Sequence, residues 1–220
     1  MHNKYLYFVI KRLFDLVTSI IVLIITSPVL ILVGLIIFTQ FDGPIFFRQI
    51  RIGKFEKEIT IYKFRSMKNN TDFDSKITSK NDQRVTKFGT FIRRYKIDEL
   101  PQLFNVIAGN MSIVGPRPEN GKFISLLSDE DKIYYKIKPG ITSPASIVFR
   151  NENDLIQEND AESFYVNEIL PIKTILNNRY YKEMSFSYDL KIIFATAISI
   201  LFKSKMSLKD IKSKFLRSNK

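Results

Sequence analysis

Residues 84–119 read RVTKFGTFIRRYKIDELPQLFNVIAGNMSIVGPRPE and place an acidic pair inside a basic field bounded by glycine and proline turns. The adjacent carboxylates Asp98 and Glu99 stand at the centre, and the stiff triplet Pro116-Arg117-Pro118 closes the stretch. Basic side chains precede the pair at Lys87, Arg93, Arg94 and Lys96. Carboxylates bind hard cations or attack phosphorus, and arginines clamp phosphate oxygens in bidentate fashion. The stretch therefore suits a Mg²⁺–phosphate site, although acidic residues also open the first turn of many ordinary helices.

The composition narrows the chemistry that the chain can perform. Its 220 residues, enough for one sizeable domain, carry 34 Lys+Arg against 22 Asp+Glu, a net charge of +12. This balance favours an anionic partner: nucleic acid, an anionic membrane leaflet or a phosphorylated substrate. The sequence has no cysteine and a single histidine, His2, which excludes disulfides, thiol nucleophiles, zinc–thiolate sites and multi-histidine metal centres. Catalysis must then rest on carboxylate, Lys, Tyr, Ser or Thr side chains.

Residues 16–41 form a run of 26 positions without a charged side chain, too apolar for an ordinary soluble helix. A cleaved signal peptide is disfavoured by the length of the run and by the lack of a small-x-small cleavage site. A transmembrane span and a re-entrant hairpin remain open. Ser27-Pro28 divides the run into halves of roughly 18–21 Å, shorter than a hydrocarbon core of about 30 Å. Basic residues lie on both flanks, Lys11-Arg12 before the run and Arg48 after it, so both flanks should prefer the cytoplasm.

The remaining chain predicts a mostly helical, membrane-associated α+β fold with a small β-hairpin. We expect strands at 45–47 and 58–64, helices at 87–95, 100–108, 121–137 and 190–202, and a mobile polar loop at 68–83 that covers the site. The apolar face of 190–202 either lies on the membrane or packs on the domain. The expected units are a membrane anchor at 1–42, a catalytic domain at 43–188, and an amphipathic membrane-associated helix with a basic tail at 189–220.

The central stretch closely resembles the bacterial sugar transferase family, the monotopic polyprenyl-phosphate phosphoglycosyl transferases, of the small catalytic-core type. Members carry an arginine, a Leu/Ile-Asp-Glu-Leu-Pro-Gln-Leu-x-Asn-Val run and a Met-Ser-x-x-Gly-Pro-Arg-Pro run, which match Arg93, 97–106 and 111–118. The resemblance covers roughly residues 10–205. Where the family usually has Gly-Trp-Ala-Gln, this chain has Ser143-Pro144-Ala145-Ser146, so the sugar preference is not transferred through this loop.

The resemblance implies transfer of a sugar-1-phosphate from a nucleotide sugar, usually UDP-linked, to undecaprenyl phosphate, with UMP as the second product. This would be the first membrane-committed step of a surface glycan pathway. It also implies a re-entrant membrane helix broken at Ser27-Pro28, and a monotopic enzyme on the cytoplasmic face of the bacterial inner membrane, in contact with its lipids. The sugar, the glycan pathway and the oligomeric state stay open, a homodimer included.

The same resemblance implies roles for single residues. Asp98 becomes the nucleophile that attacks the β-phosphorus and carries the sugar phosphate as an acyl phosphate, with ping-pong kinetics. Glu99 together with Asp98 holds Mg²⁺, or Glu99 assists the acceptor. The substrate-binding residues are Arg93 on the transferred phosphate, Pro116, Arg117 and Pro118 against uridine, Lys63 and Arg65 at the site, and Arg150, whose alternative is a surface ion pair with Glu152.

Two other functions compete with this one. The net charge of +12 also fits a membrane-bound non-catalytic scaffold or a polyanion-binding protein that is indifferent to Asp98. Nucleic acid is not an expected partner, because the sequence has no recognition-helix or RNA-binding aromatic motif. A homologue that has lost activity and serves as an assembly factor is disfavoured by the intact acidic pair and Pro-Arg-Pro triplet.

Overall fold

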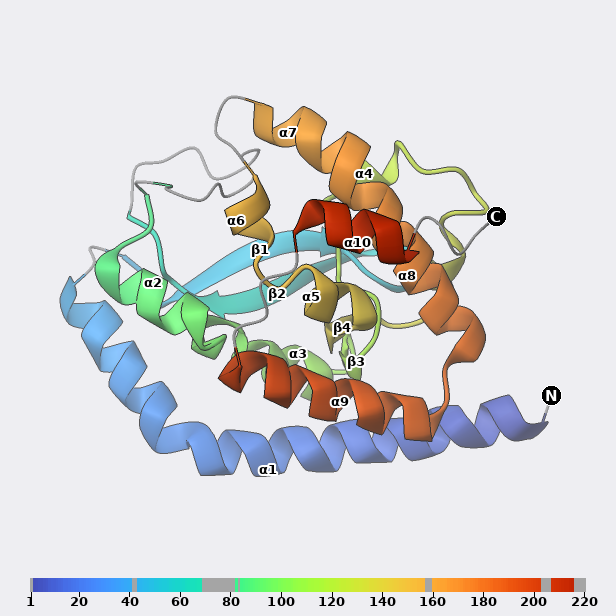
Figure 1. Ribbon diagram of the computed structural model, residues 1–220. Helices are drawn as coiled ribbons and strands as arrows, with labels where there is room; N and C mark the ends of the chain where they lie inside the picture. The colour runs from blue at the N-terminus through green and yellow to red at the C-terminus, as the bar shows by residue number, and fades with distance from the viewer. Residues whose placement is uncertain are drawn as a thin grey trace.

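A computed structural model describes residues 2–40, 43–68, 82, 84–156, 160–202 and 207–215. Two small β-ladders lie at the centre of the domain and helices surround them, with α1 and α9 side by side along one edge (Figure 1). The prediction of a mostly helical α+β fold is confirmed. Most of the expected loop at 68–83 lies outside the described residues. The helices are α1 (His2–Gln40), α2 (Lys87–Arg94), α3 (Gln102–Ile107), α4 (Gly121–Ile124), α5 (Pro144–Val148), α6 (Glu152–Leu155), α7 (Ala161–Phe164), α8 (Leu170–Glu183), α9 (Phe186–Leu201) and α10 (Leu208–Phe215).

The N-terminal helix α1 is one unbroken helix that bends towards its C-terminal end (Figure 1). Pro28 lies inside it and cannot donate the backbone hydrogen bond that the Ile24 carbonyl would accept. The Ser27 hydroxyl donates to that carbonyl instead, at 2.8 Å. The serine therefore replaces the bond that the proline removes, and the helix kinks without breaking. The break expected at Ser27-Pro28 is therefore a bend within one helix, and the re-entrant path of this helix stays a prediction. Among the described helices, α1 alone is long and apolar enough to cross a membrane.

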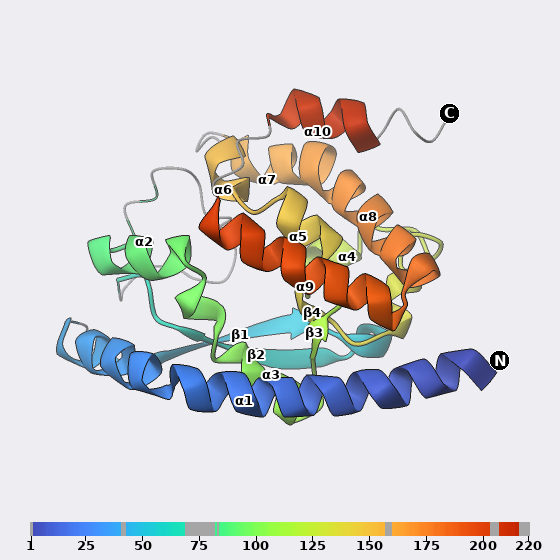
Figure 2. The ribbon, with the colours of Figure 1, turned by 60° about the horizontal axis from the view of Figure 1, so that its bottom comes forward.

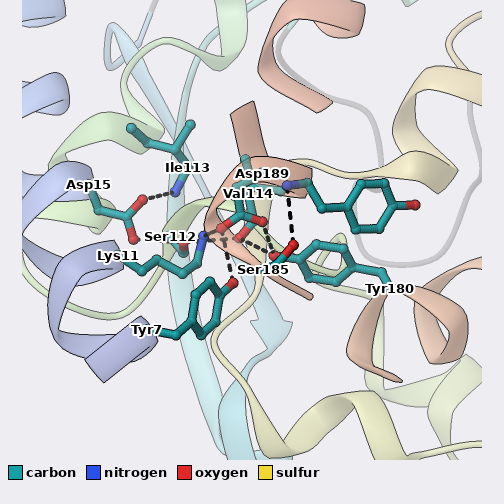
Figure 3. A network of polar contacts seen from close by, with 10 residues as sticks. Tyr7, Lys11, Asp15, Ser112, Ile113, Val114, Tyr180, Ser185 and Asp189 are labelled. Carbon is teal, nitrogen blue, oxygen red and sulfur yellow. Dashed lines mark hydrogen bonds and ion pairs between the residues drawn. The ribbon is translucent and has the colours of Figure 1, made fainter. Parts of the chain in front are cut away.

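The first half of α1 is fixed to the domain by buried polar contacts (Figure 3). Tyr7 Oη and Lys11 Nζ both donate to Asp189 Oδ2 of α9, at 2.9 and 2.8 Å. Tyr180 Oη of α8 donates to the other carboxylate oxygen at 2.7 Å. The Asp189 carboxylate of α9 therefore joins the N-terminal helix α1 to the C-terminal helices α8 and α9.

Two further side chains of α1 bind helix α3 and the segment Ser112–Val114, which both follow the acidic pair in the chain. Asp15 accepts hydrogen bonds from Ser112 Oγ at 2.7 Å and from the Ile113 amide at 3.1 Å. Arg12 donates to the carbonyls of Val106 and Ile107 at the end of α3, at 2.6 and 2.9 Å. Cations near the C-terminal carbonyls of a helix are stabilising, because the helix dipole is negative there. The charged residues before the apolar run thus hold α1 on the domain.

The strands form two separate pairs. β1 (Phe46–Ile52) pairs antiparallel with β2 (Glu58–Phe64), with Phe46 opposite Phe64 and Ile52 opposite Glu58. The predicted hairpin is confirmed, although β1 extends beyond 47. β3 (Ser112–Val114) runs parallel to β4 (Gly140–Thr142).

A close approach of two backbones follows the parallel pair. A Cβ on Gly140 would lie 2.1 Å from the Gly115 nitrogen, and a Cβ on Gly115 would lie 2.6 Å from the Lys138 carbonyl oxygen. Only glycine fits this crossing. The crossing fixes the chain at the point where the Pro-Arg-Pro triplet begins.

Several helix predictions hold and one fails. The helices expected at 87–95, 100–108 and 190–202 are present as α2, α3 and α9. The helix expected at 121–137 is wrong, because α4 ends at Ile124 and only a 3-10 turn forms at Ile133–Lys136. The Ser128 hydroxyl binds the backbone and side chain of Asp131 locally, which competes with helix formation. Phe104 of α3 is 51% exposed, so the apolar side chains of this helix do not all face the core.

The largest core cluster lies under α8. It joins Phe123, Ala145, Phe149, Ile156, Tyr165, Ile169, Leu170, Ile172, Leu176 and Ile211. Ile211 belongs to α10, so this part of the expected basic tail is packed on the domain, while residues 216–220 lie outside the described residues. On α9 most of the predicted apolar face points away from the core, with Phe194 at 69% and Leu201 at 77% exposed. Figure 2 shows α9 at the front of the domain, above α1.

Candidate active site

The acidic pair is presented by a left-handed residue followed by a tight turn. Helix α2 ends at Arg94, and Lys96 adopts φ 59°, ψ 20°, the left-handed region that an L-residue seldom occupies. A 3-10 turn at Ile97–Glu99 then buries both Asp98 and Glu99, each 7% exposed. Two adjacent buried carboxylates repel each other, and they persist only where cations compensate them.

Glu99 is the compensated member of the pair. Arg117 donates Nη1 to Oε2 at 3.0 Å and Nη2 to Oε1 at 2.7 Å, a bidentate ion pair. Lys96 and Lys63 place their Nζ atoms 3.7 and 3.8 Å from Oε1. Burial alone would raise the pKa of Glu99, but Arg117, Lys96 and Lys63 outweigh it and hold that pKa well below the usual range. Glu99 is therefore ionised and its orientation is fixed.

Asp98 is the less compensated member, although the charges of Lys63, Lys96 and Arg93 act on it. Its Oδ1 atom is buried and accepts no hydrogen bond from any residue that the structure describes. Burial and the neighbouring Glu99 raise the pKa of Asp98 above its ordinary value. A buried carboxylate oxygen without a donor is poised to bind a cation or to attack an electrophile. The environment thus separates two neighbouring carboxylates into a fixed anion and an available one.

The acidic pair offers carboxylate oxygens, which are suitable ligands for Mg²⁺. Asp98 offers an unengaged oxygen, whereas both Glu99 oxygens face Arg117. The described residues contain no group of three or more His, Cys, Asp or Glu that could hold a metal. Protein-bound Mg²⁺ commonly takes one or two carboxylates, with water and substrate phosphates as its other ligands. A metal at this pair would accordingly depend on oxygen atoms brought by a substrate.

Arg93 approaches the pair from the last turn of α2. Its Nε donates to the buried Ser66 Oγ at 2.8 Å, which fixes the guanidinium. Burial lowers the pKa of Arg93, and the carboxylates of Asp98, Asp82 and Glu99 oppose this shift. The backbone of α2 packs closely against the backbone at Ser66, because Gly89 has no side chain. A Cβ at Gly89 would lie 2.0 Å from the Ser66 carbonyl oxygen, so a larger residue would push α2 away from this position.

One cavity of ≈ 1440 Å³ joins most of the predicted site residues. Its lining includes Lys63, Arg65, Arg93, Asp98, Glu99, Arg117, Pro118 and Arg150. Pro116 and the helix-bend residues Ser27 and Pro28 are not among the lining residues. The cavity also reaches Thr18 and Val22 of α1 and Leu201 of α9. Basic side chains surround the acidic pair in this cavity, and the apolar helices α1 and α9 border it. A site of this size and composition suits a large ligand with an anionic group and an apolar part.

Arg150 connects two helix ends. Its Nη2 donates to the carbonyls of Arg94 and Ile200, at 3.3 and 3.2 Å. The alternative ion pair with Glu152 is not formed, because Glu152 binds Lys173 instead, at 2.7 Å. Lys173 was not among the predicted site residues, and neither were its partners on the cavity wall. Glu119, which directly follows the Pro-Arg-Pro triplet, was the one member that its position in the sequence could have suggested.

The segment that departs from the family pattern lines the same cavity. Ser143 caps helix α5, and its Oγ accepts the Ser146 amide at 2.9 Å, while Pro144 occupies the first turn. Ala145 and Ser146 both border the cavity. The sequence Ser143-Pro144-Ala145-Ser146 therefore begins a regular helix, and the side chains that it places on the cavity wall differ from those of the usual family sequence.

Comparison with known proteins gives one consistent family. The model of the bacterial sugar transferase family matches residues 6–203. A UDP-glucose:undecaprenyl-phosphate glucose-1-phosphate transferase of Klebsiella pneumoniae is 41% identical over 194 residues, 86% of this chain and 39% of that protein. A UDP-N-acetylgalactosamine-undecaprenyl-phosphate N-acetylgalactosaminephosphotransferase of Aeromonas hydrophila is 34% identical and covers 89% of this chain and 44% of its own length. The uncharacterized sugar transferase EpsL of Bacillus subtilis is 34% identical over 88% of both chains.

Proposed function

The chain belongs to the bacterial sugar transferase family, and on that premise we propose that it transfers a sugar-1-phosphate from a UDP-sugar to undecaprenyl phosphate and releases UMP. The names of the Klebsiella and Aeromonas relatives support this reaction class, and they differ in the sugar. The chain spans 39% of the length of the first relative and 44% of the second. The family match over residues 6–203 contains the site described above. The reaction would begin the synthesis of a surface polysaccharide.

The observation that carries the proposal is the unpartnered Oδ1 of Asp98 beside the clamped Glu99. In the first step Asp98 attacks the β-phosphorus, the phosphoanhydride bond to UMP breaks, and the sugar phosphate remains on the carboxylate as an acyl phosphate. In the second step a phosphate oxygen of undecaprenyl phosphate attacks the same phosphorus. The Asp98 carboxylate leaves, and the lipid diphosphate sugar is formed.

The surrounding cations bind and orient the phosphates. Arg93 contacts the transferred phosphate, and its bond to Ser66 keeps the guanidinium in place before substrate arrives. Lys63, Arg65 and Arg150 line the same cavity and add positive charge. Both Nη atoms of Arg117 are bound to Glu99, which leaves its Nε and the cavity-lining Pro118 for uridine.

Mg²⁺ is part of the proposal, with Asp98 and Glu99 as the residues that would hold it. The ion would neutralise charge on the diphosphate during transfer. The unengaged Oδ1 of Asp98 supports this assignment. Glu99 contributes by holding negative charge at this position at every working pH, because its pKa is lowered well below the usual range.

We further propose that α1 enters and leaves the cytoplasmic leaflet of the inner membrane by one face. Both ends of α1 contact the same domain: Lys11 binds Asp189, while Val33 and Ile37 pack with Phe64 of β2. A straight span would separate these contacts by the thickness of the membrane. The middle of the helix exposes its apolar side chains, among them Ile20, Ile21, Ile24, Ile25, Ile31 and Leu32. The outward apolar face of α9 would lie in the same interface.

Release of UMP by the purified, detergent-solubilised protein tests the proposal. The protein is incubated with Mg²⁺, undecaprenyl phosphate and a panel of UDP-sugars, and UMP is followed. We expect sustained UMP release with at least one donor, dependent on acceptor, on metal and on Asp98. A folded protein that binds vesicles and polyanions but releases no UMP with any donor, beside an active control enzyme, would favour the scaffold function instead.

A further inference from the structure

A second cluster of charged residues lies on the wall of the same cavity. Lys173 of α8, with its side chain 7% exposed, forms ion pairs with Glu152 at 2.7 Å and with Glu119 at 3.6 Å. Its Nζ also donates to Tyr165 Oη at 3.1 Å and lies 4.8 Å from the centre of that ring. All four residues line the cavity that contains Asp98.

A buried polar atom beside this cluster has no partner. Asn177 lies one helical turn beyond Lys173 on α8, is 2% exposed and also lines the cavity. Its Oδ1 accepts no hydrogen bond from the residues described in the structure. Buried amide oxygens are nearly always satisfied, since an unmade hydrogen bond costs about 1–3 kcal/mol. An orphaned acceptor at this wall therefore indicates a ligand that donates hydrogen bonds.

The charge of the cluster identifies the part of a ligand that it suits. Glu119 and Glu152 are balanced by Lys173 and by Arg51, which lines the same cavity and interacts electrostatically with both carboxylates. The cluster therefore has no net positive charge to attract a phosphate. The carboxylates and the Asn177 oxygen are acceptors for hydroxyl or amide N–H groups, and Lys173 is a donor. Positive charge prevails at Arg93 and Lys63, and Arg117 connects the two groups because it interacts with Glu119 and Glu152 as well as with Glu99. The cavity therefore has a cationic part for phosphates and a charge-balanced part for a neutral polyhydroxyl group.

We propose that Glu119, Glu152 and Lys173, with Asn177, form the subsite that binds and selects the sugar of the nucleotide-sugar donor. This inference rests on the proposed transferase function. Glu119 stands two positions after Arg117, and its backbone carbonyl accepts the Ile52 amide at 2.9 Å, which fixes it relative to the phosphate-binding wall. The sugar is attached directly to the β-phosphate, so its subsite must adjoin the residues that bind that phosphate.

The test compares a ligand that contains the sugar with one that lacks it. Glu152→Gln keeps the shape of the side chain and removes its charge, and Glu119→Gln does the same from another segment if the first variant unfolds. The matched control is Glu183→Gln, which removes a carboxylate from the exposed Arg179–Glu183 pair. For each variant we would measure KM for two UDP-sugars that differ at one hydroxyl, the inhibition constant of UMP, and thermal unfolding.

We expect Glu152→Gln to raise KM for the preferred UDP-sugar about tenfold or more and to change the ratio of kcat/KM between the two donors. The inhibition constant of UMP should stay within about twofold, as it should in the control. If the affinities for UMP and for the UDP-sugar fell equally, the cluster would bind the nucleotide and not the sugar. If KM stayed unchanged and only the thermal stability fell, the cluster would be a purely structural ion pair. Either result overturns the inference. Absence of UMP release by the wild-type protein would instead overturn the proposed function, and the subsite with it.

Discussion

Asp98 and Glu99 are neighbours in sequence with opposite surroundings. Arg117 clamps Glu99 and lowers its pKa, whereas Asp98 has a buried oxygen without a donor and a raised pKa. Pairs of titratable groups with divergent pKa values commonly mark an acid–base or nucleophilic assignment. The asymmetry is visible only in the folded chain, because Arg117 lies 18 positions from Glu99.

Substitution of each carboxylate should give a different result. We expect Asp98→Asn to abolish UMP release, because an amide cannot form the acyl phosphate. Glu99→Gln should lower kcat by about 10²–10³, since it removes an oriented charge but leaves the nucleophile. Steady-state UMP release measures both, and UMP binding to each variant controls for folding. Near-native activity of either variant would refute the corresponding role.

Lys63 predicts an alkaline limit for activity. Burial lowers its pKa to about 8, although Glu99 opposes the shift. As the pH rises through about 8, the free enzyme loses this positive charge, and kcat/KM for the anionic donor should fall. Lys63→Arg should keep the charge and shift the fall to higher pH, because a guanidinium does not titrate in this range. Overlapping kcat/KM profiles for the two proteins between pH 6.5 and about 9.5 would contradict this assignment.

At the scale of elements, much was predictable from local patterns. The β1–β2 hairpin and helices α2, α3 and α9 were expected because alternation, capping and apolar spacing are local signals. Helix α8 was not expected, since its buried face includes Lys173, Thr174 and Asn177. Polar residues that are buried by tertiary contacts give no amphipathic pattern. The continuity of α1 was also missed, because the compensation of Pro28 by the Ser27 hydroxyl depends on a side-chain rotamer.

The ion pair between Lys11 of α1 and Asp189 of α9 should contribute strongly to the free energy of unfolding. Lys11→Met removes one partner of a buried ion pair and leaves Asp189 with only Tyr7 and Tyr180. We expect a loss of about 3–5 kcal/mol in the free energy of unfolding. Denaturant or thermal unfolding in detergent measures it. Lys191→Met on the exposed side of α9 is the matched control and should change stability by less than about 0.5 kcal/mol. Equal effects of the two substitutions would contradict the importance of this contact.

The whole molecule explains why the site could be predicted only in part. Five predicted site residues stand in one long motif, and the structure brings them to one cavity: Arg93, Asp98, Glu99, Arg117 and Pro118. The Lys173 cluster combines four segments, and its members are ordinary charged residues in the sequence. Their meeting point depends on how α8 packs against the rest of the domain. The cavity between the acidic pair and the apolar helices is likewise a property of the assembled fold.

Membrane topology is testable with single cysteines, because the sequence has none. Lys4→Cys and Lys57→Cys place exposed thiols on either side of the apolar part of α1. We expect a membrane-impermeant maleimide to label neither in intact spheroplasts and both after lysis, because both ends contact one cytoplasmic domain. A periplasmic thiol protein serves as the positive control. Labelling of one of the two cysteines in intact spheroplasts would show a spanning helix.

The central claim is that Asp98 carries the sugar phosphate between the two substrates. The most direct measurement mixes the enzyme with Mg²⁺ and a UDP-sugar labelled in the sugar, without undecaprenyl phosphate, and follows UMP and protein-bound label together. The account predicts a burst of UMP of about one equivalent per enzyme, with matching label on the Asp98 peptide that undecaprenyl phosphate removes. Asp98→Asn should show neither. Sustained turnover with acceptor, but without a burst or protein-bound label in its absence, would contradict the covalent mechanism.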